Sequence, residues 1–329
     1  MLIDPHNRRI TYLRLSVTDR CNFRCVYCMP PEGVERLEHA AMMSYEEIEA
    51  FVTVAAKVGI CEVRITGGEP LVRSDLPLLV AKLNQIEGIQ EVSLTTNGLL
   101  LENAAPKLAQ AGLKRVNISL DTLNADKFNR ITRGGSFEKV WRGIQAAERY
   151  GLTPIKINTV VIRGINDDEI VDLARLTLED DWHVRFIELM PFQNQTPWGE
   201  GFPEPEKAYV PIDEILEKLL PLGLEREDGY SGNGPAVAYR LQKGRGKIGL
   251  ISPLSEHHFC RRCNRIRLTP DGYLRPCLLS DIEVHVLPAM RAGEPILPLL
   301  QQAILLKPIG HELAENRSLK GRYMAQIGG

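Results

Sequence analysis

Short apolar runs alternate with amphipathic stretches over the first two-thirds of the chain. The apolar runs, each of the length of a buried strand, are Thr11–Val17, Glu62–Thr66, Glu91–Thr95, Arg115–Leu120, Ile155–Val161 and Val184–Leu189. The stretches with a helical apolar repeat are Tyr45–Val58, Asp75–Ile86, Glu102–Gln110, Phe137–Tyr150 and Asp168–Leu178. Strand alternating with helix predicts an α/β fold with a parallel sheet and helical crossovers. Both a doubly wound sheet and part of a β/α barrel fit this pattern.

Cap and turn residues mark the ends of the predicted helices. Ser44 precedes the first helix and Glu47 follows three residues later, which is the pattern of a capping box. Glycines of the kind that end helices precede the next strands at Gly59, Gly88, Gly112 and Gly151.

Polar residues gather where the predicted strands end. Three cysteines follow the first strand, and Gly67-Gly68-Glu69-Pro70 follows the second. Further polar residues at or near the later strand ends are Thr95–Gly98, Ser119–Asp121, Lys156, Asn158 and Glu188. Functional residues of parallel α/β folds collect beyond the carboxyl ends of the strands. The sequence therefore predicts an active site at this edge of the sheet.

The pattern changes near residue 191. A loop rich in proline, glycine and glutamine, Pro191–Pro205, leads to a short predicted helix, Ile212–Leu219. A glycine-dotted, β-like region follows, and the chain from Arg291 again has helical apolar spacing. We expect two domains, residues 1–225 and residues 226–329.

The 329 residues carry a formal net charge of −2, which argues against a surface built for bulk binding of nucleic acid or acidic lipid. Pro298, Gln301 and Gln302 interrupt the most apolar stretch, and the first residues reach charge and proline before any signal-peptide core. We expect a cytoplasmic protein. Its seven cysteines then favour metal ligands or catalytic thiols over disulfides, apart from Cys61, which we interpret as a small hydrophobe.

Cys21, Cys25 and Cys28 form a C-x₃-C-x₂-C arrangement at the end of the first predicted strand. One loop with this spacing can wrap three thiolates around an inorganic centre, and thiolates suit iron–sulfur clusters or zinc. Three cysteines on a 4Fe-4S cluster leave one iron open to a small molecule. A zinc site completed by a distant histidine or cysteine is the alternative.

A second set comprises Cys260, Cys263 and Cys277, with C-x₂-C-x₁₃-C spacing. Again three thiolates have no obvious fourth partner. Because His257 and His258 lie nearby, zinc bound by one histidine and three cysteines is as consistent with this spacing as an iron–sulfur cluster.

Arginines surround the second set. Arg265 and Arg267 alternate along a probable strand and therefore share one face, where two guanidinium groups suit a polyphosphate. Arg14, Arg64 and Lys156 come from the predicted parallel strands and could face the same space. A solvated basic loop is the alternative. The chain contains no phosphate-binding Walker loop.

The first cysteine set, with Tyr27 just before Cys28, resembles the signature of the radical S-adenosylmethionine (SAM) superfamily, and Gly67–Pro70 matches that superfamily's second motif. The resemblance implies that the open iron binds the amino and carboxylate groups of SAM. One electron from the cluster then cleaves the sulfonium to give methionine and a 5′-deoxyadenosyl radical.

The two cysteine triplets, Asn264-Arg265-Ile266-Arg267-Leu268 and the terminal Gly328-Gly329 look like the GTP 3′,8-cyclase (MoaA) family over essentially the whole chain. This resemblance implies an incomplete (β/α)₆ barrel, whose open side is closed by a C-terminal segment with a second 4Fe-4S cluster. It also implies a lyase of molybdenum cofactor biosynthesis. The radical would take the 3′ hydrogen of GTP, and C3′ would join C8 to give 3′,8-cyclo-7,8-dihydroguanosine 5′-triphosphate.

The resemblance also implies roles for single residues. Contacts to SAM are expected from Tyr27, Gly68, Ser119 and Met190. Contacts to GTP are expected from Arg14, Arg64, Thr95, Lys156, Arg265, Ile266 and Arg267. Each triplet would hold one 4Fe-4S cluster, and the open iron of the second would bind the guanine base.

The expected partners are an electron donor such as flavodoxin or ferredoxin and, downstream, a cyclic pyranopterin monophosphate synthase. We expect a monomer or homodimer that binds neither nucleic acid nor membrane. One alternative is another radical SAM enzyme with an auxiliary C-terminal cluster, of the peptide-maturing type, which GTP binding would distinguish. A non-catalytic zinc or iron–sulfur protein is a second alternative, which metal content and SAM cleavage would distinguish.

Overall fold

The computed structural model describes residues 1–190, 198–227, 235–256, 259–311 and 321–328. Four positions that matter to the sequence predictions lie outside these ranges. They are Pro191, at the start of the predicted loop; His257 and His258, the alternative zinc ligands; and Gly329.

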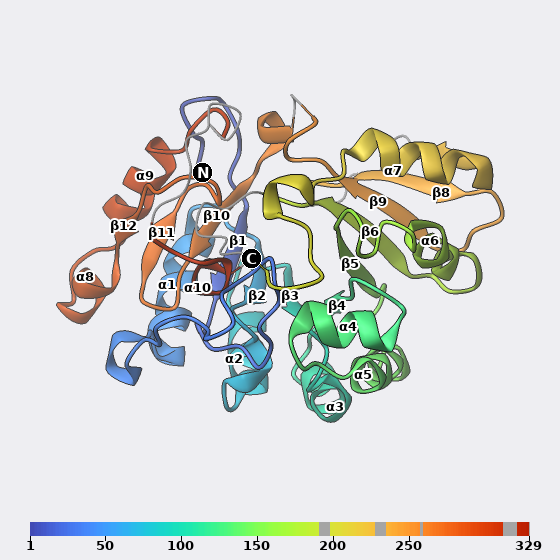
Figure 1. Ribbon diagram of the computed structural model, residues 1–329. Helices are drawn as coiled ribbons and strands as arrows, with labels where there is room; N and C mark the ends of the chain where they lie inside the picture. The colour runs from blue at the N-terminus through green and yellow to red at the C-terminus, as the bar shows by residue number, and fades with distance from the viewer. Residues whose placement is uncertain (191–197, 228–234, 257–258, 312–320, 329) are drawn as a thin grey trace.

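The strands of the described residues form one mixed sheet (Figure 1). From one edge to the other they are β12 (Val284–His285), β11 (Tyr273–Arg275), β10 (Arg265–Leu268), β1 (Tyr12–Ser16), β2 (Glu62–Thr66), β3 (Glu91–Thr96), β4 (Arg115–Ser119), β5 (Lys156–Val161), β6 (His183–Glu188), β9 (Lys247–Ile251), β8 (Val237–Leu241) and β7 (Leu224–Arg226).

Strands β1 to β6 are parallel and neighbour one another in the order of the chain. A doubly wound sheet reverses its strand order at a switch point, whereas here every crossover advances the sheet by one strand. The sheet also remains open, with β12 and β7 as its edges. The fold is therefore an incomplete β/α barrel, the second of the two architectures that the sequence allowed.

The C-terminal segment extends this sheet at both ends. β10 pairs parallel with β1, so that Arg267 lies opposite Arg14. β9 pairs parallel with β6 on the other side. Since Thr11 N donates to Asn264 O at 3.1 Å, the second cysteine set lies beside the start of β1.

The helices are α1 (Tyr45–Lys57), α2 (Leu76–Asn84), α3 (Leu101–Gln110), α4 (Ala125–Thr132), α5 (Phe137–Arg149), α6 (Ile170–Glu179), α7 (Ile212–Leu219), α8 (Leu287–Arg291), α9 (Leu297–Leu305) and α10 (Met324–Ile327). The crossover helices α1 to α6 cover one face of the sheet (Figure 1). On that face strand residues such as Leu13 and Val63 form one apolar core with helix residues such as Phe51 and Leu79. Each such burial contributes about 1.5–3 kcal/mol. No described helix has the length and apolar character needed to cross a bilayer.

The predicted elements agree with the observed ones to within two residues at each end. The capping box is confirmed, because Glu47 N donates to Ser44 Oγ at 3.2 Å and Ser44 N donates to Glu47 Oε2 at 2.8 Å. The four helix-ending glycines all have positive φ. Helix α4 was not predicted, since Phe128 and Ile131 are its only large apolar residues. Cys61 is half-buried rather than buried, so its interpretation as a core hydrophobe holds only in part.

The C-terminus returns to the carboxyl ends of β1 and β2. Ala325 and Ile327 of α10 are buried, and Gly328 follows in the left-handed region with φ 72°. A Cβ on Gly328 would overlap Thr66 Oγ1 and lie 3.0 Å from the Cβ of Ser16. This close approach explains why glycine stands here.

Candidate active site

Alternate strand residues face away from the helices and form a polar layer on the opposite face of the sheet, because side chains along a strand point to its two faces in turn. The positions of this layer in β1, β2, β4, β5, β6 and β10 include Arg14, Arg64, Asn117, Lys156, Asn158, Arg185 and Arg267. Lys156, Arg64, Arg185 and Arg267 are all buried. Cations therefore line the face that the crossover helices leave open.

The first cysteine set lies in the loop after β1. Arg24 N donates to Thr132 O and Val26 N donates to Ile131 O, both at 3.0 Å, so α4 holds this loop in place. Burial raises the pKa of the Cys28 thiol to about 12, and Cys21 adds to this increase.

Burial, followed by Cys28, Asp121 and Cys21, also raises the pKa of Cys25 well above its usual value. Such mutual effects require neighbouring thiols. The structure thus brings Cys21, Cys25 and Cys28 together, as their spacing predicted.

Gly67 and Gly68 lie against the backbone of this loop. Gly68 N donates to Thr18 O at 2.7 Å, and Glu69 N donates to Arg20 O at 2.8 Å. A Cβ on Gly67 would lie 2.8 Å from Thr18 O, and one on Gly68 would overlap Arg20 O. Only glycine permits this approach, which explains the Gly-Gly pair at the end of β2.

The Glu69 carboxylate joins the ends of β2 and β3. It accepts hydrogen bonds from Asn97 N at 2.7 Å, Thr96 Oγ1 at 2.8 Å and Leu71 N at 2.9 Å. Burial raises its pKa to about 7, while these hydrogen bonds oppose the increase. A carboxylate held so firmly can orient an ammonium group at the edge of the sheet.

Asp121, at the end of β4, positions the aromatic residue of the first cysteine loop. Tyr27 Oη donates to Asp121 Oδ2 at 2.7 Å, and Val160 N donates to Asp121 Oδ1 at 2.8 Å. Burial raises the pKa of Asp121 to about 6. The cysteine loop, β4 and β5 are therefore connected through one carboxylate.

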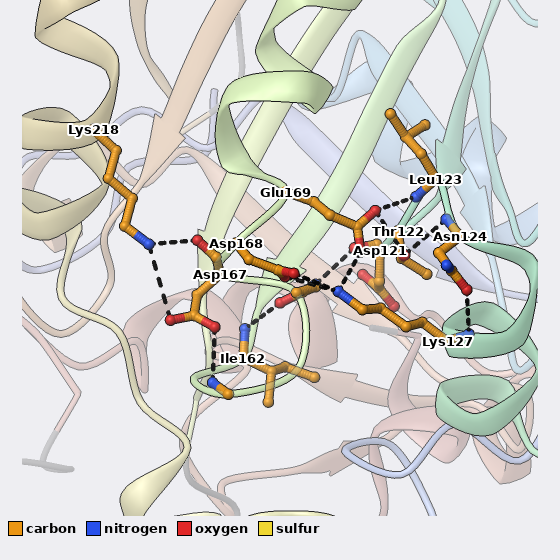
Figure 2. A network of polar contacts seen from close by, with 12 residues as sticks. Asp121, Thr122, Leu123, Asn124, Lys127, Ile162, Asp167, Asp168, Glu169 and Lys218 are labelled. Carbon is orange, nitrogen blue, oxygen red and sulfur yellow. Dashed lines mark hydrogen bonds and ion pairs between the residues drawn. The ribbon is translucent and has the colours of Figure 1, made fainter.

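A wider polar network supports Asp121 (Figure 2). Glu169 accepts from Leu123 N at 2.7 Å and from Thr122 Oγ1 at 2.7 Å, and it pairs with Lys127 at 2.9 Å. Lys127 also contacts Asp168 at 2.8 Å. These contacts fix the loops after β4 and β5 relative to each other.

The second cysteine set is assembled from two separate segments. Cys260 lies in a short 3₁₀ helix, Phe259–Arg262, and Cys277 follows β11. Burial, then Cys277 and Cys263, raises the pKa of Cys260, so these thiols are also neighbours. Burial would raise the pKa of Cys263 too, but Arg265 and Lys307 outweigh it and lower this pKa to about 7. In the described part of the chain, no three His, Cys, Asp or Glu side chains are placed to hold a metal ion as they stand.

The cations of the polar layer repel one another. Burial, with a further contribution from Arg185, lowers the pKa of Lys156 to about 6. Burial and nearby Arg64 lower the pKa of Arg14 to about 10. Burial and Arg14 lower that of Arg267 well below its usual value. A buried group of like charges is costly unless an anion compensates it.

Several buried polar atoms of this layer lack hydrogen-bond partners within the described residues, among them Arg265 Nε, Asn158 Oδ1, Glu62 Oε2 and Arg115 Nε. Unsatisfied buried polar atoms cost about 1–3 kcal/mol each. Arg267 Nη1 donates to Gly328 O at 2.5 Å, so the C-terminal residues supply a partner for one of the cations. The arrangement suits a polyanionic ligand with further polar groups.

The predicted contact residues occupy the expected strands, with one qualification. Thr95 and Ser119 lie at the carboxyl ends of β3 and β4, and Met190 follows β6. Ile266, however, is completely buried and belongs to the apolar core on the helical face. Any contact of Ile266 with a ligand on the polar face must therefore use its backbone.

Sequence reasoning missed Arg185, Asp121 and Lys307 as members of these sites. Arg185 had a usable signal, because it is a charged residue between the apolar Val184 and Phe186 of a predicted strand. Asp121 was noted only as a strand-end residue. Lys307 had no local signal, because its partners lie more than thirty residues away.

Two family models match the chain. The first, described as Radical SAM superfamily, covers residues 15–177, and the second, described as Molybdenum Cofactor Synthesis C, covers residues 182–313. The GTP 3′,8-cyclase of Pelotomaculum thermopropionicum is 49% identical over 333 residues, with 99% of each chain covered. That of Listeria monocytogenes is 46% identical over 339 residues, covering 100% of this chain and 99% of the relative.

Solved structures share the fold at low sequence identity. Streptococcus suis SuiB bound to S-adenosylmethionine gives a TM-score of 0.64 with 14% identity, covering 95% of this chain and 76% of that one. Native anSMEcpe with bound AdoMet gives a TM-score of 0.56 with 17% identity, covering 84% and 77%. These likenesses concern the fold alone.

Proposed function

The chain belongs to the GTP 3′,8-cyclase family of the radical SAM superfamily, and from this premise we propose how its own residues carry the reaction. The family activity converts GTP to its 3′,8-cyclised form in molybdenum cofactor biosynthesis, using 4Fe-4S clusters and SAM. When bound, the first cluster and SAM supply a 5′-deoxyadenosyl radical that removes the 3′ hydrogen of GTP. The protein's part is to bind, orient and shield the reactants.

Cys21, Cys25 and Cys28 are proposed to hold the first cluster. Three neighbouring, half-buried thiols on one loop are a donor set that fits an iron–sulfur centre with one open iron. Glu69, buried and held by three hydrogen bonds, is placed beside this loop by the Gly67-Gly68 approach.

Contacts to SAM are proposed for Tyr27, Gly68, Ser119 and Met190. Support comes from their positions at the carboxyl ends of the strands around the first cysteine loop. The Asp121 hydrogen bond restricts the Tyr27 ring and thereby shapes that side of the pocket for SAM.

The triphosphate of GTP is proposed to bind the buried cations of the polar layer, and this layer is the observation that carries the proposal. The proposed side-chain contacts are Arg14, Arg64, Thr95, Lys156, Arg265 and Arg267, with Ile266 contributing through its backbone. Guanidinium groups bind phosphate oxygens in pairs. A bound triphosphate would offset the burial and the mutual repulsion that together lower the pKa values of Lys156 and Arg14.

Cys260, Cys263 and Cys277 are proposed to hold the second cluster. Arg267 lies between the polar layer and this centre. Burial, Arg14 and Arg265 lower its pKa, whereas Cys277 and Cys263 act to raise it, so its guanidinium is close to both the cations and the cysteines. The second cluster and the proposed phosphate contacts therefore lie close enough for one nucleotide to reach both.

We further propose the finer points of organisation and partnership. A low-potential one-electron carrier such as flavodoxin or ferredoxin supplies electrons, and a cyclic pyranopterin monophosphate synthase receives the product. Residues 1–225 form the barrel domain and 226–329 the cluster-bearing C-terminal domain, in a cytoplasmic monomer or homodimer. Seven free thiols support a reducing compartment.

Nucleotide binding tests this proposal against the peptide-maturing alternative. Equilibrium dialysis of the reconstituted protein with GTP, GMP and inorganic tripolyphosphate separates base from phosphate recognition. We expect GTP to bind best, tripolyphosphate to compete with it, and GMP to bind more weakly. Equal affinity for GTP and GMP would contradict the role given to the cations.

A further inference from the structure

The segment from Lys307 to His311, which follows α9, forms a strap over the second cysteine set. None of its residues is a proposed cluster ligand or nucleotide contact. Lys307 is only 3% exposed although it carries an ammonium group. Burial of an ammonium is costly without a compensating charge or hydrogen bonds, so its surroundings indicate its function.

Lys307 Nζ lies between the two parts of the cysteine motif. It donates to Arg265 O at 2.7 Å, just after Cys263, and to Pro276 O at 2.5 Å, just before Cys277. Lys307 also lies near the Cys263 thiol, since its charge helps to lower the pKa of that thiol. One ammonium thus joins two segments of the motif that are more than ten residues apart in the sequence and lies beside a proposed ligand.

The counter-charge for Lys307 comes from the cysteines. Within the described residues its hydrogen bonds go to two carbonyls, and none goes to a carboxylate. Backbone carbonyls carry no net charge, so the neighbouring cysteine sulfurs, once they hold a cluster, are the groups that can compensate the buried ammonium.

The rest of the strap contacts Cys260. The His311 backbone N–H acts to lower the pKa of the Cys260 thiol, against the larger effect of burial, so it lies close to that sulfur. A Cβ on Gly310 would lie 4.0 Å from the same sulfur, so the backbone passes directly over it. The strap therefore places N–H groups beside the sulfurs at both ends of the C-x₂-C part of the motif.

Arg8 anchors the strap from the N-terminal turn. Its Nη1 donates to Cys260 O at 2.9 Å and to Ile309 O at 3.0 Å, and its Nη2 donates to Pro308 O at 2.5 Å. Arg8 is itself held by Asp4 at 2.5 Å. The strap is thereby tied to the loop that carries Cys260.

We propose that Lys307 is a positioning residue that sets the charge at the second iron–sulfur centre, through its buried ammonium and its two hydrogen bonds to the carbonyls beside Cys263 and Cys277. This inference rests on the proposed assignment of a cluster to Cys260, Cys263 and Cys277. Outer-shell partners of metal ligands fix ligand orientation and tune the centre. Reduction by one electron adds negative charge to the site, and a buried ammonium beside a ligand sulfur stabilises that charge. Lys307 thus raises the reduction potential of the second centre.

A redox titration followed by electron paramagnetic resonance tests this role. The parent is the full-length chain with Cys21, Cys25 and Cys28 all replaced by alanine, reconstituted with iron and sulfide, so that the second centre gives the only cluster signal. We expect Lys307→Met to shift the redox equilibrium about tenfold toward the oxidised form, a decrease of about 59 mV for one electron. Lys307→Arg, which keeps the charge, should change it by less than about twofold.

Lys139→Met is the matched control, because it removes the same charge from an exposed position of α5, in a separate part of the molecule (Figure 1). It should leave the potential unchanged. A Lys307→Met protein with full iron content and the parent's potential would overturn the proposal. If Lys307→Met retains no iron, the neutral Lys307→Gln is compared with the charged Lys307→Arg. Equal reduction potentials of these two variants would overturn the proposal.

The outcome also separates this inference from the proposed function. A parent protein without any iron–sulfur signal contradicts the assignment of the second cluster itself, and the role of Lys307 falls with it. A parent with a normal signal that Lys307 substitutions leave unshifted contradicts the inference alone. Thermal unfolding of each apoprotein, unchanged from the parent, excludes a general loss of fold as the cause of a shift.

Discussion

The two cysteine sets differ in how the chain assembles them. The first lies within eight residues of one loop after β1, and α4 holds its backbone. The second joins a 3₁₀ helix, the end of β11, the strap from Lys307 to His311 and the N-terminal Arg8. One site is local, whereas the other exists only when distant parts of the chain have folded together.

Their electrostatic surroundings differ as well. At the first set, burial and then acidic or thiol neighbours raise the pKa values, with Asp121 acting on Cys25 and Glu69 on Cys21. At the second set, burial raises the pKa of Cys260, whereas Arg265 and Lys307 lower that of Cys263 to about 7.

Negative surroundings disfavour the addition of an electron, and positive surroundings favour it. With a cluster on each set, as proposed, we expect the second centre to be easier to reduce than the first.

Loss of a first-set ligand has the largest expected effect. Cys25→Ala should abolish both 5′-deoxyadenosine formation and GTP cyclisation, because the radical originates at the first centre. Chromatography of both products under reducing, anaerobic conditions checks this. Formation of either product by the variant would remove the first set from the mechanism.

Loss of a proposed ligand in the second set should uncouple SAM cleavage from GTP cyclisation. Cys263→Ala should stop GTP cyclisation, since the nucleotide is no longer held correctly, while slow uncoupled cleavage of SAM remains. The ratio of 5′-deoxyadenosine to cyclised product measures this. If both activities disappear together, as with Cys25→Ala, the two sets do not have separate roles.

Removal of a buried cation should weaken nucleotide binding. Arg267→Met deletes a charged hydrogen-bond donor worth ~2–3 kcal/mol, so the dissociation constant for GTP should rise by about 30- to 150-fold. Arg261→Met, at an exposed arginine of the same motif, is the matched control and should stay within about twofold. Equal effects of the two substitutions would argue against a specific phosphate contact.

Lys156 should make GTP binding depend on pH. Its pKa of about 6 in the free protein means that it is neutral above that pH, whereas a bound triphosphate favours the charged form. Binding therefore takes up a proton, and affinity should fall by up to about tenfold per pH unit between pH 7.5 and 8.5. Calorimetry in buffers of different ionisation enthalpy checks the uptake. Lys156→Arg, which stays charged, should bind GTP without taking up a proton. If this variant still takes up a proton on binding, the proton goes to another group.

The smallest effect is expected at Tyr27. Tyr27→Phe removes the hydrogen bond to Asp121, worth about 1 kcal/mol, and should weaken SAM binding about fivefold. Tyr45→Phe makes the same change where the hydroxyl donates to Ser74 O, away from the cysteine loop, and should not alter SAM affinity. An unchanged affinity in Tyr27→Phe would show that the ring position does not depend on Asp121.

The sequence predicted the barrel well because its signals are local. Each strand and crossover helix has its own apolar period, cap or terminating glycine, as Ser44 and Gly59 illustrate. The cysteine spacings likewise predicted two groups of neighbouring thiols, which the structure brings together, while their role as cluster ligands stays a prediction. Helix α4 was missed because its stability comes from packing of Phe128 and Ile131 rather than from a long periodic stretch.

Contacts between distant residues could not be predicted. Lys307 meets Pro276 and Arg265 only after α9 has packed on the sheet, and no sequence pattern connects these positions. The same holds for Arg267 and Gly328, which are 61 residues apart. Ile266 shows a different limit of the sequence prediction. The Asn264–Leu268 motif includes it as a contact residue, yet its side chain faces the apolar core.

The most direct test of the account is an anaerobic assay of the reconstituted protein with dithionite, SAM and each nucleoside triphosphate separately, with products identified by mass spectrometry. We predict 5′-deoxyadenosine with GTP, together with a product of unchanged GTP mass that acid treatment converts to a pterin. Deoxyadenosine in equal amounts with every nucleotide, and no cyclised product, would contradict the assignment of GTP as the substrate.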